Sequence, residues 1–264
     1  MEASENFREK TPEIKNEWLY LAIPAVAIAF AEMQMYLGRQ IQSMVVHAVI
    51  LLGLSVSTMF IKSEDIQRTY QALILLPIMR IVNLSIPVFY ETTLYSLVFI
   101  YSLLAVPASI AATQQGFTRT QLGIKFKKLW IYFPLSILLG LLLAEGEYLI
   151  IRTNSLIPDL SIFNILTLSV IMIFFVGVVE EIIFRSVLQN RLQMLLGNWN
   201  GLIFTSILFG LMHSVYGSIY EVLYASLVGL FIGYLFYRTR SLPLAALIHG
   251  CINVFLFGII PLLL

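Results

Sequence analysis

Nine long apolar stretches, separated by short polar breaks, run along this 264-residue chain. An α-helix needs about 20 mostly apolar residues to cross a lipid bilayer. The stretches cover residues 18–36, 44–61, 70–89, 94–112, 129–151, 162–188, 202–215, 222–237 and 242–264. The seventh and eighth are short, so a version with eight spans and one re-entrant segment stays open. The sequence therefore predicts an all-α fold, a polytopic transmembrane helix bundle of eight to nine membrane segments.

The composition agrees with a chain that lies in a lipid bilayer. Hydrophobic residues make up 59% of the chain and charged residues only 12%, whereas soluble domains are about half apolar and about a quarter charged. A formal net charge of +1 gives no sign of a nucleic-acid-binding surface. The one cysteine, Cys251, excludes an internal disulfide framework. Nothing in the sequence indicates a cofactor.

Lysine and arginine residues gather in alternate loops, which predicts the orientation of the chain, because such residues stay on the cytoplasmic side. With nine spans, 13 of the 16 Lys and Arg residues share the side of the N-terminus, and only Arg39 and Arg152 lie opposite. A cytoplasmic tail is expected at residues 1–17. It is followed by N-terminal membrane helices without a recognised motif (18–128) and by C-terminal membrane helices (129–264).

Ionisable residues inside membrane helices are costly, by about 2.5–3.5 kcal/mol each on insertion scales, so each needs a reason. The last third of the chain reads VVEEIIFR at 178–185, FGLMH at 209–213 and HGCIN at 249–253. Helical periodicity puts residues four apart on one face. Glu181 can therefore pair with Arg185, whereas Glu180 is turned by about 100° and lacks that partner.

The other two motifs have the same four-residue spacing. The Phe209 ring is expected to pack beside the His213 imidazole, and His249 and Asn253 share a face from which Cys251 points away. At 1.5 Å per residue, Glu180 lies about 15 Å from the helix end near residue 190, and His213 lies about 18 Å from the start of its helix. His249 lies at a similar depth of about 12 Å. These polar groups are therefore predicted to share one layer, reached from the cytoplasmic side.

Arranged as EExxxR, FxxxH and HxxxN/D on successive membrane helices, these residues resemble the CPBP family of intramembrane proteases, which includes CAAX prenyl endopeptidases and bacteriocin-processing and immunity proteins. The resemblance covers about residues 162–258, and the segment 118–125 (TRTQLGIK) resembles a polar stretch found upstream in such proteins. It implies a protease core in which Glu180 and His213 activate water. It also implies that His249 and Asn253 stabilise the oxyanion and that Glu181 and Arg185 support the site.

The chemistry of the residues agrees with that implication. Peptide hydrolysis needs a base, a trapped water and donors aimed at the developing oxyanion. The predicted function is hydrolysis of a peptide bond in a membrane-associated or lipidated substrate, such as a prenylated CAAX C-terminus, without a bound metal. Two alternatives stay open: a zinc-dependent metalloprotease, since one carboxylate and two histidines are a known ligand set, and a non-enzymatic immunity or transport-type membrane protein.

Charged residues in the N-terminal half carry no motif. His47 is expected to bridge helices at the non-cytoplasmic end, away from the predicted polar layer. Arg80 has three readings: a partner for Glu32, a lining residue of a water-filled cavity, or a sign that its span is broken at Pro77.

Overall fold

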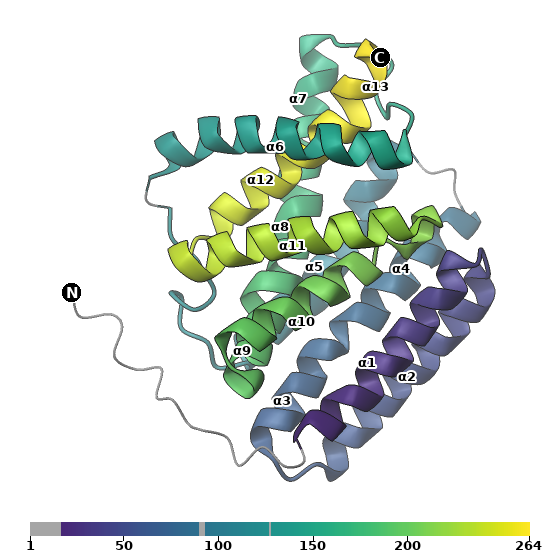
Figure 1. The fold of residues 1–264 in the computed structure, drawn as a ribbon, viewed down its shortest axis with the longest axis vertical. Coiled ribbons are helices and arrows are strands. Elements are labelled where there is room, and N and C mark those ends of the chain that lie inside the picture. The colour runs from purple at the N-terminus through teal and green to yellow at the C-terminus, as the bar shows by residue number, and fades with distance from the viewer. Residues whose placement is uncertain (1–16, 90–92, 127) are drawn as a thin grey trace.

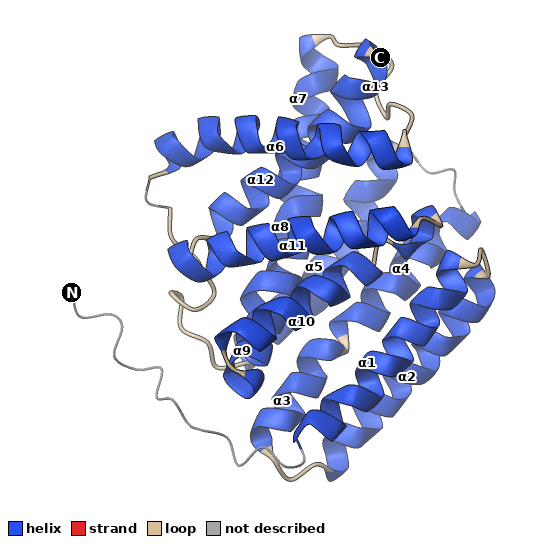
Figure 2. Ribbon diagram, viewed as in Figure 1, coloured by secondary structure: helices blue, strands red, loops and turns tan. Residues whose placement is uncertain are grey.

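The computed structural model describes residues 17–89, 93–126 and 128–264 (Figure 1), and all regular structure in these ranges is helical (Figure 2). The helices are α1 (Glu17–Tyr36), α2 (Gln40–Phe60), α3 (Glu64–Leu73), α4 (Leu75–Phe89), α5 (Leu94–Gln114), α6 (Leu129–Ile151), α7 (Ile162–Val170), α8 (Val178–Glu181), α9 (Asn190–Leu196), α10 (Asn198–Leu211), α11 (Ile219–Thr239), α12 (Leu242–Val254) and α13 (Ile260–Leu263). Between them lie the π-helical segments η1 (Ile171–Gly177), η2 (Ile182–Gln189) and η4 (Phe255–Ile259) and the 3-10 turn η3 (Ser214–Tyr216).

The predicted all-α membrane bundle is confirmed. Among the described residues, seven helical spans are long and apolar enough to cross a membrane, including the continuous Ile162–Leu196 and Leu242–Leu263. Each of the nine predicted stretches contains helix, so the predicted number of eight to nine segments is compatible with the structure. Two of the nine stretches are too short to count as spans. The seventh forms α10, which has 14 residues, and the third is divided between two helices.

The third stretch is interrupted at Ile74, between α3 and α4. Pro77 lies three residues further on, and a proline clashes with the carbonyl four residues before it, here that of Leu73. The helical axis therefore breaks just ahead of Pro77. Of the readings offered for this region, a break near Pro77 is correct.

Large apolar side chains cover the outside of the bundle. Phe60 on α2, Trp130 on α6, Ile162 on α7 and Tyr220 on α11 are all more than 70% exposed. A soluble monomer rarely exposes apolar surface on this scale. The exposed apolar surface is therefore the surface that contacts lipid.

The helices form two groups that are joined by α5 and by direct contacts of α1 with η3 and of α3 with α9 and η2 (Figure 1). Among the N-terminal helices α2 packs against both α1 and α4, and α5 contacts α4 on one side and η1 and η2 on the other. In the second group α12 packs against both α6 and η1, and α10 packs against α11. The helix that carries the EExxxR motif therefore lies inside the bundle, between the two groups.

Two glycines let α12 approach that helix closely. A Cβ on Gly250 would lie 2.6 Å from Ile173 Cα, and one on Gly177 would lie 2.9 Å from Ala246 O. Neither backbone could keep its place with a side chain there. This contact sets His249, the neighbour of Gly250, against the glutamate pair that follows Gly177.

Candidate active site

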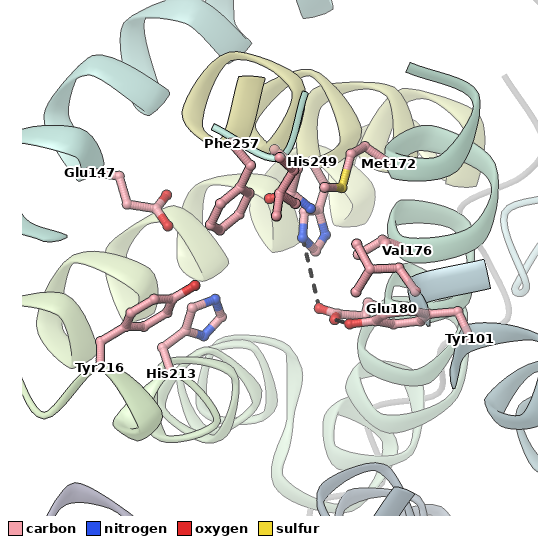
Figure 3. Close-up of a pocket in the computed structure, with 12 residues that line it drawn as sticks. Tyr101, Glu147, Met172, Val176, Glu180, His213, Tyr216, His249 and Phe257 are labelled. Atoms are coloured by element: carbon pink, nitrogen blue, oxygen red, sulfur yellow. Dashed lines mark hydrogen bonds and ion pairs between the residues drawn. The ribbon is translucent and has the colours of Figure 1, made fainter. Parts of the chain in front are cut away.

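A cavity of about 310 Å³ lies between α5, α6, η1, α8, α12 and the connection from α10 to α11. It is lined by Leu97, Tyr101, Glu147, Leu156, Met172, Val176, Glu180, His213, Tyr216, His249, Asn253 and Phe257 (Figure 3). The structure thus brings together the four residues with predicted catalytic roles, Glu180, His213, His249 and Asn253, from three separate helical segments.

Glu180 lies on the four-residue turn α8, between the π-helical segments η1 and η2. Single π turns are frequent at functional sites. Its carboxylate accepts a hydrogen bond from the Tyr101 hydroxyl, and its Oε2 lies 3.8 Å from His249 Nε2. Glu180 was predicted to lack an arginine partner of the kind that Glu181 has in Arg185. No arginine pairs with Glu180, but the Tyr101 hydroxyl of α5 donates a hydrogen bond to one of its carboxylate oxygens.

Glu181 faces away from the cavity and joins two motifs. Its Oε2 lies 3.0 Å from Arg185 Nε, and its Oε1 lies 2.9 Å from His249 Nδ1. The predicted pairing of Glu181 with Arg185 is therefore correct, and both side chains are fully buried. Because an ionised carboxylate only accepts hydrogen bonds, His249 donates through Nδ1 and turns Nε2 toward the cavity.

His213 follows the end of α10, and its ring is oriented by its own helix. Nδ1 lies 3.0 Å from the carbonyl oxygen of Phe209. A carbonyl only accepts, so Nδ1 carries the proton, and Nε2 of the neutral ring is left as an acceptor. Phe209 also packs as predicted, with its ring centroid 4.9 Å from that of His213.

The Phe209 ring is the centre of a packed cluster under the site. It meets Phe184 edge-on at 4.9 Å and His249 at 5.7 Å, and the Arg185 guanidinium lies 4.9 Å from its centroid. A cation over an aromatic face in a dry site is stabilised by the ring quadrupole. Phe209 therefore links all three motifs through packing.

Asn253 lines the cavity one turn beyond His249, as their spacing predicts. Cys251 is buried and is not among the cavity-lining residues. Among the described residues, no group of three His, Cys, Asp or Glu side chains is placed to hold a metal ion.

Residues 162–255 match the family model described as type II CAAX prenyl endopeptidase Rce1-like. The similarity to the Rce1-like family therefore covers about a third of the chain. The match begins at α7 and ends at Phe255, the first residue of η4, so it includes all three motifs and confirms the resemblance to CAAX-type membrane proteases. No curated protein and no solved structure matches the chain.

The N-terminal helices, outside the Rce1-like segment, hold the backbone on both sides of His213. Arg80 donates to both oxygens of Glu32, at 3.0 and 2.7 Å, and to the Met212 carbonyl at 2.6 Å. On the other side of His213, the Ser214 hydroxyl donates to Glu32 Oε2 at 2.5 Å. Arg80 therefore pairs with Glu32, and this pair is tied to the turn that carries His213.

His47 completes this network, with Nε2 3.0 Å from Glu32 Oε1. The prediction that His47 bridges helices is correct, since it joins α2 to α1. The prediction that it lies away from the polar layer is wrong, because Glu32 joins it to Ser214, the neighbour of His213. His213 lies beyond the end of α10, at the same end of the bundle as His47. The polar groups therefore lie deeper in the bundle than the depths that were counted from the helix starts.

The end of the bundle near the start of α1 is closed by packed side chains. Tyr70 of α3 donates to the Tyr20 carbonyl of α1, and Arg68 and Arg191 both donate to the Gln115 carbonyl. Between Glu180 and this end, residues 183–193 are all buried.

The cavity instead extends toward the opposite end, where α1 finishes. Its lining includes Leu156 in the loop after α6 and Tyr216 in η3. The neighbouring Gly217 lies beside Tyr36, the last residue of α1, since a Cβ there would lie 3.7 Å from the Tyr36 carbonyl oxygen. The cavity and the start of α1 therefore lie at opposite ends of the bundle, and the opening of the site on the cytoplasmic side stays a prediction.

The upstream polar segment 118–125 belongs to the closed end. Ser186 and Asn190 donate to the carbonyls of Leu122 and Gln121, and the Gly123 carbonyl accepts from the Leu242 amide. Gly123 has a φ of +77°, and a Cβ there would lie 2.5 Å from the Phe236 ring. The segment thus joins the ends of the helices that carry the motifs.

Three cavity residues were missed by the motif search: Tyr101, Glu147 and Tyr216. Glu147 is an ionisable residue near the end of an apolar stretch, but it belongs to no motif. Tyr101 had a weaker signal, a hydroxyl about 10 Å inside an apolar helix, which needs a hydrogen-bond partner. Tyr216 lies in a connection where no periodicity applies.

Proposed function

We propose that this membrane protein of the Rce1-like family is an endopeptidase that hydrolyses a peptide bond with a water molecule activated by Glu180. The observation that carries the proposal is the different environment of the two adjacent glutamates. Glu181 is fully buried and occupied by Arg185 and His249, whereas Glu180 faces a cavity shared with His213 and Asn253. One carboxylate is structural, and the other is available for chemistry.

The reaction follows from the groups that face the cavity. Water bound between Glu180 and the Nε2 acceptor of His213 loses a proton to Glu180 as its oxygen attacks the substrate carbonyl carbon. The tetrahedral intermediate then collapses, the C–N bond breaks, and the proton passes to the leaving amine. Tyr101 donates to one oxygen of Glu180 and so orients the other oxygen toward the water.

The oxyanion is stabilised from α12. The Asn253 amide and His249 Nε2 lie on one face of that helix and line the cavity. With Nδ1 donating to Glu181, Nε2 carries a proton when the ring is an imidazolium. Donors preorganised in this way contribute most where charge develops in the transition state.

The substrate is a peptide that reaches the site within or beside the bilayer. Apolar side chains make up much of the cavity wall, including Leu97, Leu156, Met172, Val176 and Phe257. They suit a substrate with apolar residues or a lipid chain close to the scissile bond. The family description makes a prenylated CAAX C-terminus the first candidate.

The direct test is to incubate the purified protein with a farnesylated CAAX peptide and with its non-prenylated counterpart, and to identify the products by mass spectrometry. We expect cleavage at one internal bond and faster cleavage of the prenylated peptide. Cys251→Ala serves as the matched control, since the buried thiol lies outside the cavity and its loss should change turnover less than about twofold. Failure to cleave any membrane-associated peptide would contradict the proposed activity.

A further inference from the structure

A second carboxylate points into the cavity, across from Glu180. Glu147 lies near the end of α6, is 7% exposed and lines the cavity (Figure 3). A buried carboxylate needs hydrogen-bond donors or a cation, because leaving water is costly for a charged group. Apart from the carboxyl group of Glu221, no side chain in the described part of the chain is recorded as hydrogen-bonding to Glu147 or pairing with it as a cation.

Glu221 of α11 lies behind Glu147, with the two carboxyl groups within hydrogen-bonding reach of each other. Glu221 is fully buried, and neither of its side-chain oxygens has a donor within the described part of the chain. Two carboxylates in contact repel each other when both are ionised. A positive charge placed beside Glu147 would relieve that repulsion.

The cavity is lined by no permanently charged cation, since neither a Lys nor an Arg is among its lining residues. The two buried arginines nearest to the site are already occupied, Arg80 by Glu32 and Arg185 by Glu181. The cavity therefore carries acidic side chains on two walls, Glu180 on one and Glu147 on the other, with no Lys or Arg between them.

We propose that Glu147, with Glu221 behind it, forms a subsite that binds a Lys or Arg side chain of the substrate close to the scissile bond. This inference rests on the proposed peptidase function and names the substrate class of the same cavity. A basic side chain entering the subsite brings the missing cation and donors. A substrate with a carboxylate at that position would be repelled.

The test uses prenylated peptides that differ at one position, which carries Lys, Gln or Glu and is moved in turn through the residues flanking the scissile bond. For the wild-type protein we expect one position at which Lys raises kcat/KM about tenfold over Gln. Glu147→Gln should bring the Lys-to-Gln ratio close to one, and Glu147→Lys should favour the Glu peptide. Glu145→Gln is the matched control, because Glu145 lies two residues away on the exposed face of the same helix and should keep the wild-type ratio.

The outcomes separate the subsite from the peptidase function. Cleavage of all three peptides at equal rates, unchanged in Glu147→Gln, would overturn the subsite and leave the function standing. If the wild-type protein cleaves none of them, the function fails, and the affinity of labelled Lys and Gln peptides for the intact protein still tests the subsite. If the Glu147→Lys protein does not fold, the same binding measurement on the Glu147→Gln protein takes its place. Equal affinities for the Lys and Gln peptides in the wild-type protein would refute the subsite.

Discussion

Replacing Arg80 with Met tests whether the N-terminal helices support the catalytic histidine. Arg80 is 4% exposed, and its guanidinium makes two hydrogen bonds to Glu32 and one to the Met212 carbonyl. Methionine keeps the length and apolar stem but leaves Glu32 buried without its cation. Breaking a buried ion pair in this way costs about 3–5 kcal/mol. For a chain of this size that corresponds to a fall in thermal midpoint of about 10 °C.

The assay combines thermal unfolding in detergent with kcat measured well below the midpoint of the variant. Because Arg80 and Glu32 hold the residues on both sides of His213, we expect kcat to fall about tenfold or more even where the variant is folded. The double variant Arg80→Met with Glu32→Gln should recover part of the stability, since no charge is then stranded.

Arg68→Met is the matched control for the loss of an arginine. Arg68 forms a partly exposed ion pair with Glu64 worth about 0–1 kcal/mol and one hydrogen bond to the Gln115 carbonyl worth about 1 kcal/mol, so its loss should cost less than that of Arg80. The reasoning is refuted if Arg80→Met has wild-type kcat, or if it is no less stable than Arg68→Met.

Glu181→Gln should lower both the thermal midpoint and turnover, because it strands the fully buried Arg185 at a cost of about 3–5 kcal/mol; wild-type stability would contradict this. Extensive dialysis against a strong chelator should leave turnover unchanged, and activity restored specifically by zinc would favour the metalloprotease alternative. Cysteines at Thr120 and Asn154, in a Cys251→Ala background, should react with an impermeant thiol reagent from opposite sides of the membrane, with only Asn154→Cys labelled from outside intact cells. Labelling of both from one side would contradict the observed arrangement, and the reverse pattern would place the cavity on the cytoplasmic side.

The local part of the site could be predicted because helical periodicity determines it. Residues four apart lie on one face in any helix, which is why the Glu181–Arg185 pair and the packing of Phe209 on His213 follow from spacing alone. Apolar length likewise predicted the helical membrane bundle.

Contacts between distant segments could not be predicted in this way. Tyr101 and Glu180 are 79 residues apart, and Glu32 and Ser214 are 182 apart, so only the packing of α1 and α5 onto the motif helices brings them together. The direction in which the cavity opens depends on side-chain packing around residues 183–193, and charge counts in loops say nothing about it. Pro77 is a local signal for the helix break at Ile74. The position of that break relative to α3 depends on the tertiary fold.

The turnover of Glu180→Gln is the most direct test of the catalytic role given to Glu180. Glutamine keeps the shape of the side chain and can still accept the Tyr101 hydrogen bond, but it cannot take a proton from water. Because Tyr101 can still donate to the glutamine and His249 keeps its pairing with Glu181, the thermal midpoint should stay within about 3 °C of wild type. We expect kcat for the farnesylated CAAX peptide to fall by about 100-fold or more, in line with the loss of a general base. Near-normal turnover by the folded Glu180→Gln protein would contradict the assignment of Glu180 as the base.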